Sequence, residues 1–261
     1  MFKKICKIYL LFSVLMMPTL AFANISVFPY SIDFDAASNK RVQSVRIINT
    51  SQETQTYRVS MVNFEQDANG KLTETKEPSP FDANKYLTWS PRQFTLKPNE
   101  VQTINIARRS LAQAPDGEFV SHLKISEVLL GAPKLKSKDG GQSNTISMQL
   151  RALFAITIPV TITKGDNLFS KTEVVSYKLL PNNQLNLVLK RLGNKSSRFN
   201  VVVADQKDKD IGRVNGLKIY MSTDTLSVNV PLDKNVQTKN AVLKLEDAKT
   251  KEEILRKALH I

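Results

Sequence analysis

Residues 146–162 read ISMQLRALFAITIPVTI and alternate between apolar and polar side chains. All nine even-numbered positions are apolar, namely Ile146, Met148, Leu150, Ala152, Phe154, Ile156, Ile158, Val160 and Ile162. The odd-numbered positions include Ser147, Gln149, Arg151, Thr157 and Thr161. Successive side chains of a β-strand point to opposite faces, so this period of two predicts one strand with a continuous apolar face.

This strand is too long for one small domain. At about 3.3 Å per residue it would span roughly 55 Å, about three times the usual strand length. We expect the strand to enter a core from Phe154 onward and to lead toward a second domain. The apolar face before Phe154 has no core to cover it, and such an exposed strand promotes aggregation unless a partner binds it.

The segments on the amino-terminal side of this strand share its period of two. Strands are predicted at residues 42–48, 56–62, 93–96, 101–107 and 119–128. Turns such as Lys97-Pro98-Asn99-Glu100 separate them, and Pro at the second turn position presets its own φ angle. Strands that recur every ~8–14 residues between turns indicate an antiparallel sandwich rather than alternating strands and helices.

Two polar segments interrupt this pattern. Residues 64–85 contain Asn69-Gly70, which favours a tight turn, and we expect a loop or a small hairpin there. Residues 131–145 (GAPKLKSKDGGQSNT) are basic and contain several Gly and Ser residues, so we expect a mobile loop.

A second set of strands follows a boundary at Lys164-Gly165-Asp166-Asn167. Its predicted members are residues 171–180, 184–192, 198–204, 214–220, 225–231 and 240–246. The last segment, residues 247–261, fits either a short helix over Glu252–Leu259 or an edge strand that carries Leu255 and Leu259. The fold class is therefore all-β, with two sandwich domains in tandem.

The first 23 residues have the features of a cleaved export signal. Lys3, Lys4 and Lys7 form a basic start, Ile8–Leu20 is apolar, and Ala21-Phe22-Ala23 has the small-x-small form of a signal-peptidase site. Removal of those three lysines lowers the formal net charge from +13 to +10. The single cysteine, Cys6, leaves with the signal.

This composition excludes several classes of protein. An exported chain without cysteine has no disulfide framework, thiolate nucleophile or cysteine-ligated metal, and two histidines do not supply a His-rich metal site. We therefore expect no cofactor and no metal. The Lys and Arg residues are scattered along the predicted strands instead of clustered, which argues against a nucleic-acid partner.

Enzymatic patterns are equally weak. Ser121 and Lys124 match a Ser-x-x-Lys motif, but that nucleophile needs a helical turn, and in a strand the two side chains lie on opposite faces. The carboxylates of Asp205, Asp208 and Asp210 miss the spacing of a calcium loop. We expect the protein not to be an enzyme.

The order of these features resembles the periplasmic chaperones of the chaperone–usher pilus pathway, the PapD-like family. Residues 88–109 (TWSPRQFTLKPNEVQTINIARR) are similar to the family's Pro-x-x-Phe-x-Leu-x-Pro-Gly strand pair. Residues 115–128 (PDGEFVSHLKISEV) resemble its Pro-x-Asp-x-Glu-Ser strand, with Asp116, Glu118 and Glu127 at acidic positions. Residues 184–199 resemble the opening of its second domain. The resemblance implies two Ig-like β-sandwich domains, residues 24–163 and 164–261, after a signal peptide at 1–23.

The chain departs from this family at one site. Family members hold the carboxylate at the end of a pilus subunit between an Arg on the first strand and a Lys on the donor strand. Ser31 stands at the Arg position, and Ala155 or Thr157 stands at the Lys position. Arg151 is the only basic residue on the predicted donor strand, so Arg151, Ser31 and Thr157 are the candidates for the carboxylate anchor or the cleft around it.

The resemblance implies a function in the periplasm. The protein is expected to bind pilus or fimbrial subunits by lending them a strand, with Ile146, Met148 and Leu150 in the subunit groove, and to deliver them to an outer-membrane usher. A dimer of the free chaperone that covers this strand is a further possibility. The alternative is a structural or adhesive pilus component with Ig-like domains. Against that alternative, the chain after residue 23 goes directly into ISVFPYSIDF without a donor extension.

Overall fold

Strand β10 (Ala155–Lys164) contains the described part of the 146–162 segment. The structure is a computed structural model, and it describes residues 24–129, 153–233 and 240–260. In it, β10 pairs antiparallel with β9 (Gly117–Val128) over ten residue pairs and parallel with β2 (Ile32–Asp35) over four. It therefore lies inside a sheet, as its alternating pattern predicts.

The amino-terminal domain is a sandwich of two sheets. One has the order β2-β10-β9-β4-β5, with β7 also paired to β4, and the other has the order β1-β3-β8-β6. The remaining strands of this domain are β1 (Ile25–Phe28), β3 (Val42–Asn49), β4 (Gln55–Gln66), β5 (Leu72–Thr75), β6 (Leu87–Ser90), β7 (Gln93–Leu96) and β8 (Val101–Arg108). The short 3-10 helix η1 (Asn84–Tyr86) precedes β6.

Every strand predicted from the alternation in this half is present. The inward-facing residues form one buried cluster that includes Phe34, Ile47, Ile104 and Phe119, all 2% exposed or less. The turn between β7 and β8 places Asn99 at φ +62°, a left-handed conformation that Asn tolerates better than most residues. The related motif has Gly at this position, so Asn99 meets the same backbone requirement.

The carboxy-terminal domain is a second sandwich with its own core. Its sheets have the orders β11-β12-β15 and β14-β13-β16-β17. The strands are β11 (Ser170–Leu180), β12 (Gln184–Gly193), β13 (Ser197–Ala204), β14 (Asp210–Ile219), β15 (Thr225–Pro231), β16 (Asn240–Asp247) and β17 (Glu253–His260). Fully buried Leu187, Phe199 and Leu245 lie in this core. Residues 247–261 were predicted to form either a short helix or an edge strand. The structure has the edge strand, β17, which pairs with β16 at the end of its sheet.

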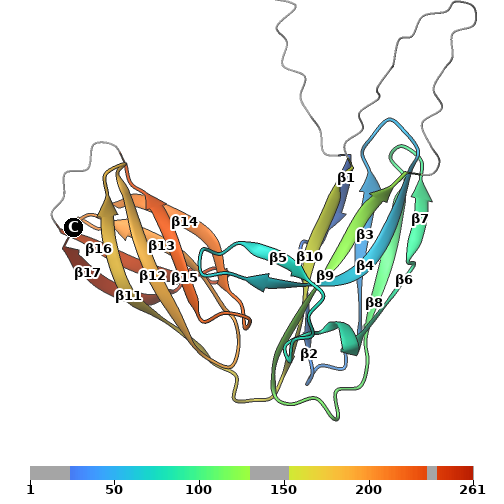
Figure 1. Cartoon of the computed structure of the whole chain (residues 1–261), viewed down its shortest axis with the longest axis horizontal. Coiled ribbons are helices and arrows are strands. Elements are labelled where there is room, and N and C mark those ends of the chain that lie inside the picture. The colour runs from blue at the N-terminus through green and yellow to red at the C-terminus, as the bar shows by residue number, and fades with distance from the viewer. Residues whose placement is uncertain (1–23, 130–152, 234–239, 261) are drawn as a thin grey trace, which may run out of the picture.

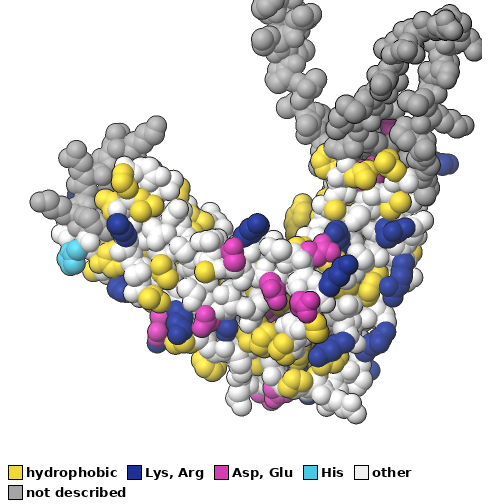
Figure 2. All heavy atoms as spheres, in the orientation of Figure 1, with side chains coloured by type: hydrophobic (Ala, Val, Ile, Leu, Met, Phe, Trp, Pro, Cys, Tyr) yellow, Lys and Arg dark blue, Asp and Glu magenta, His cyan; other side chains and the backbone are white. Residues whose placement is uncertain are grey.

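The two sandwiches form the arms of a V that meet at its base (Figure 1). The β4–β5 hairpin projects from the first sandwich toward the second, so the predicted polar segment is a hairpin in its first half. Acidic side chains gather near the junction of the arms, and basic side chains lie along the outer side of the first (Figure 2). Within the described residues, no helix has the length and apolar character needed to cross a bilayer.

Candidate functional site: the start of strand β10 and the domain junction

The apolar face of β10 leaves the core toward its amino-terminal end. Val160 and Ile162 are fully buried, Ile158 is 2% exposed, Ile156 is half-buried, and Phe154 is 54% exposed. The prediction that the strand enters the core at Phe154 is therefore wrong by two residues, one repeat of the alternating pattern. Phe154 still lies beside β9, since the amide of Glu127 donates to its carbonyl, but its side chain is outside the buried cluster of this domain.

The residues predicted to be donated precede this point. Ile146, Met148, Leu150 and Arg151, together with the loop predicted at 131–145, lie outside the described residues. Their roles stay predictions. Leu153 and Phe154, the first described residues of this segment, are both more than half exposed.

Ser31 and Thr157, the other predicted anchor residues, lie near the parallel β2–β10 ladder. Ser31 is half-buried and directly precedes β2, whose first residue, Ile32, pairs with Val160. Thr157 is exposed and lies three residues before Val160 on β10. The fold thus brings the two positions to the same pair of strands, although neither supplies a cation.

A cation does reach this pair of strands, from the other domain. Arg198 on β13 places its Nη2 atom 3.4 Å from Oδ1 of Asp33 on β2 and 3.3 Å from Oγ1 of Thr161 on β10. Its side chain is 41% exposed. The sequence pattern did not identify Arg198, because nothing in strand 198–204 indicates that its first residue faces another domain.

A buried polar cluster connects the domains beside Arg198. Glu118 on β9 is 6% exposed, accepts a hydrogen bond from the Ser196 hydroxyl, and lies 3.8 Å from Nζ of Lys218 on β14. Burial lowers the pKa of Lys218 to about 8, although the Glu118 carboxylate favours the charged form. Glu118 occupies one of the acidic positions of the resemblance, whereas Lys218 was not predicted.

His122 lies next to this cluster, in an aromatic setting. Its ring centroid is 4.8 Å from that of Phe64 and 5.9 Å from that of Tyr220. Burial, and then the positive charge of Lys218, lower its pKa to about 4. Its Nδ1 atom has no hydrogen-bond partner among the described residues. His122 is therefore neutral at neutral pH and makes a poor acid or base there.

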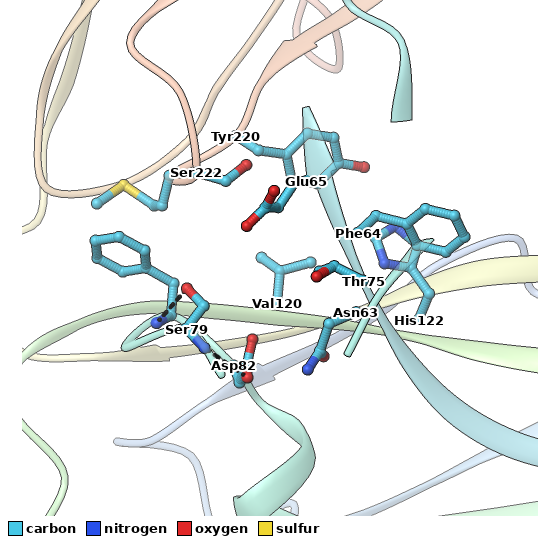
Figure 3. A pocket seen from close by; sticks show the side chains of 12 residues that line it. Asn63, Phe64, Glu65, Thr75, Ser79, Asp82, Val120, His122, Tyr220 and Ser222 are labelled. Carbon is cyan, nitrogen blue, oxygen red and sulfur yellow. Dashed lines mark hydrogen bonds between the residues drawn. The ribbon is translucent and has the colours of Figure 1, made fainter. Parts of the chain in front are cut away.

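A small cavity of about 30 Å³ opens beside His122 between the domains (Figure 3). Glu65 and Thr75 line it from the hairpin, and Tyr220 and Ser222 line it from the second domain. This volume holds one or two waters rather than a substrate. The cavity therefore offers no site for an organic substrate.

The patterns weighed for catalysis have structural explanations. The Ser121 hydroxyl is buried, accepts a bond from the Asn84 amide and donates to Asn63, whereas Lys124 pairs with Glu74 at 2.6 Å. The Asp208 carboxylate pairs with Lys244 and Arg256. Over residues 24–129, 153–233 and 240–260, no group of three or more potential metal ligands occurs.

Comparisons with known proteins gave structural matches only. No family model and no curated protein matches the sequence. Among solved structures, the chain is similar to the class 5 fimbriae chaperone CfaA, with 14% identity, a TM-score of 0.46, and coverage of 90% of this chain and 98% of that one. For the E. coli chaperone DraB the values are 12%, 0.47, 91% and 96%.

A third match is the Salmonella enterica SafB chaperone in complex with the SafA pilin, with 11% identity, a TM-score of 0.47, and coverage of 93% of this chain and 98% of that one. CfaA is a fimbriae chaperone, DraB is a chaperone, and SafB is a chaperone in complex with a pilin. In fold, the chain is an all-β protein of two β-sandwich domains in tandem, similar along most of its length to these three proteins.

Proposed function

We propose that the protein is a periplasmic chaperone that binds pilus subunits by donating the strand that begins at Ile146. The observation that carries this proposal is the burial gradient on β10, where one unbroken apolar face passes from fully buried at Val160 to 54% exposed at Phe154. The sequence continues the same alternation for four more apolar positions before Phe154. A strand whose apolar face extends beyond its own core needs an apolar groove elsewhere.

Strand donation accounts for this arrangement. An incomplete sandwich that lacks one strand offers backbone groups and an open core, and an added strand pairs with the former while its alternate side chains fill the latter. Burial of Ile146, Met148 and Leu150 would contribute roughly 5–9 kcal/mol before the cost of ordering the strand. A shift by one residue would present Ser147, Gln149 and Arg151 instead, so the alternation also sets the register.

The remaining assignments follow from this role. Residues 1–23 act as a signal peptide, residues 24–163 as the chaperone domain with the donor strand, and residues 164–261 as the second domain. The partners are pilus or fimbrial subunits and an outer-membrane usher, and the protein has no catalytic role.

The test compares substitutions on the two faces of the donor strand. Met148→Asp and Leu150→Asp each place a charge in the apolar groove of the subunit. Each should abolish co-purification of the pilus subunit whose gene lies beside the usher gene. Gln149→Asp, between them, places the same charge on the opposite face and should retain capture. Co-purification of subunit with Met148→Asp at the wild-type yield would overturn the proposal.

Fractionation of cells separates this function from that of a structural or adhesive pilus component. A chaperone stays in the periplasmic extract, whereas a pilus component appears in sheared surface fibres. Recovery of the protein in those fibres would favour the alternative.

A further inference from the structure

The β4–β5 hairpin extends beyond the sandwich to which it belongs. The β4–β9 pairing ends at Val62 opposite His122, whereas β4 continues to Gln66. In this extension, residues 63–66 pair only with residues 72–75 of β5. The described contacts at the end of the hairpin are therefore with the second domain.

Gln66 makes the central contact. Its Nε2 atom donates to the carbonyl of Lys218 at 2.8 Å, and its Oε1 atom accepts from the amide of Tyr220 at 2.9 Å. Its own amide donates to the Ser222 hydroxyl at 3.3 Å. The side-chain amide thus pairs with two backbone groups at the end of β14, one on Lys218 in the strand and one on Tyr220 directly after it, as a neighbouring strand would. Gln66 is 9% exposed, so these bonds are shielded from water.

The turn of the hairpin makes a second contact. The carbonyl of Ala68 accepts a hydrogen bond from the amide of Ser227 at 2.6 Å. Ser227 lies on β15, an edge strand that pairs only with β12 within its sheet. The hairpin therefore covers part of an open sheet edge. Gly70, at φ +82°, lies so close to Leu226 that an added Cβ would be 3.0 Å from its Cδ1 atom.

Between these points the packing is incomplete. A hollow of about 310 Å³ separates the hairpin from β14 and β15 and is lined by residues of both, including Leu72, Leu217 and Leu226. Leu72 is itself 38% exposed. The hairpin is thus held by a few directional hydrogen bonds rather than by a close-packed apolar core. Elements with this character open at a lower free-energy cost than the core does.

We propose that the β4–β5 hairpin is a latch that sets the angle between the two domains and can release it. When Gln66 and Ala68 are bound, the second domain is fixed against the first at a point distant from the linker at residues 165–169. When they detach, the contacts of Arg198 with Asp33 and of Glu118 with Lys218 remain, and the domains move about those contacts and the linker. This inference does not depend on the proposed chaperone function.

The experiment measures the distance between the domains in solution. Because the chain after residue 23 has no cysteine, Arg46→Cys on β3 and Lys207→Cys in the β13–β14 turn, both exposed, accept spin labels for pulsed electron resonance. The labelled parent should give one narrow distance distribution, and Gln66→Ala should broaden it. The matched control is Gln102→Ala, whose side chain bonds only to Thr103 within the first domain among the contacts described. It should leave the distribution unchanged. An unchanged distribution in Gln66→Ala would overturn the latch.

Amide hydrogen exchange of the unmodified protein gives a second test that does not require the variant to fold. The amides of Tyr220 and Ser227, which donate to the hairpin, should exchange at least tenfold faster than that of Val202 in the core of the second domain. They should also share one opening rate, since one latch protects both. Protection of both amides equal to that of Val202 would contradict the proposal.

Discussion

Acidification should destabilise the amino-terminal domain through His122. In the folded protein the pKa of this imidazole is about 4, lowered from 6.5 by burial and then by Lys218. The unfolded chain therefore binds a proton as the pH falls below 6.5, whereas the folded chain does not until about pH 4. The contribution of His122 to stability is complete above pH 6.5 and is lost progressively between pH 6.5 and pH 4.

The magnitude follows from the two pKa values. Between pH 7 and pH 4.5, linkage gives a loss of about 2 kcal/mol from this residue alone. The groups that face the imidazole support this direction: Phe64 and Tyr220 are uncharged, and Lys218 is positive. Two acidic residues, Glu65 and Asp82, line the adjoining cavity, and Glu118 lies against Lys218.

The assay is urea unfolding followed by the fluorescence of Trp89, which is the only tryptophan and lies in this domain. The free energy of unfolding is compared at pH 7 and pH 4.5 for the parent and for His122→Phe, which removes the titrating group. Carboxylates titrate in both proteins. The pH dependence of the free energy of unfolding in the parent, minus that in His122→Phe, therefore gives the contribution of His122. His260→Asn, at the other histidine and in the domain that Trp89 does not report, serves as the control for replacing a histidine. An equal change in the free energy of unfolding between pH 7 and pH 4.5 for the parent and His122→Phe would show that His122 does not destabilise the domain in acid.

Two further predictions concern β10 and Arg198. Ile158→Ala removes a side chain that is 2% exposed and should lower the free energy of unfolding by about 2–5 kcal/mol, whereas Thr157→Ala on the exposed face should change it by less than about 0.5 kcal/mol. Urea unfolding checks both, and equal losses would mean that the burial gradient does not describe the strand in solution. Arg198→Ala removes a cation that contacts Asp33 on β2 and Thr161 on β10, and it should weaken subunit binding by about 1.5–3 kcal/mol, the range for a hydrogen bond to a charged group. Calorimetry with purified subunit measures the affinity. The control is Arg213→Ala, whose ion pairs to Asp210 and Glu246 stay within the second domain. Subunit binding by Arg198→Ala equal to that of this control would exclude Arg198 as a residue that anchors the subunit.

Local patterns were sufficient to predict the longer strands, but not the four-residue strands β1, β2 and β6. A sheet that covers a core on one face imposes a period of two on its sequence, and nearly every strand here has one covered face. The tail was ambiguous because Leu255 and Leu259 are four residues apart, a spacing that suits a helix turn and one face of a strand equally well. Pairing with β16, a tertiary contact, selected the strand.

The polar contacts between the domains could not be predicted in this way. Gln66 and Lys218 are 152 residues apart in the chain, and Arg198 and Asp33 are 165 residues apart. Neither Gln66 nor Arg198 belongs to a motif, and each stands in a strand whose alternation tolerates a polar residue. Only the docking of one sandwich on the other decides that these side chains meet a partner.

By itself, the sequence determined that the protein is built of strands, and it predicted an export signal and a strand whose apolar face is longer than one sandwich can bury. These properties depend on neighbours in the chain, because side-chain direction alternates residue by residue. The tertiary structure alone decided where that face leaves the core, at Ile156 instead of Phe154, because burial of a strand's face depends on what packs over it. It also decided that His122 and Lys218 are buried at the domain junction, since burial of a polar group depends on what packs over it and not on its place in an alternating pattern.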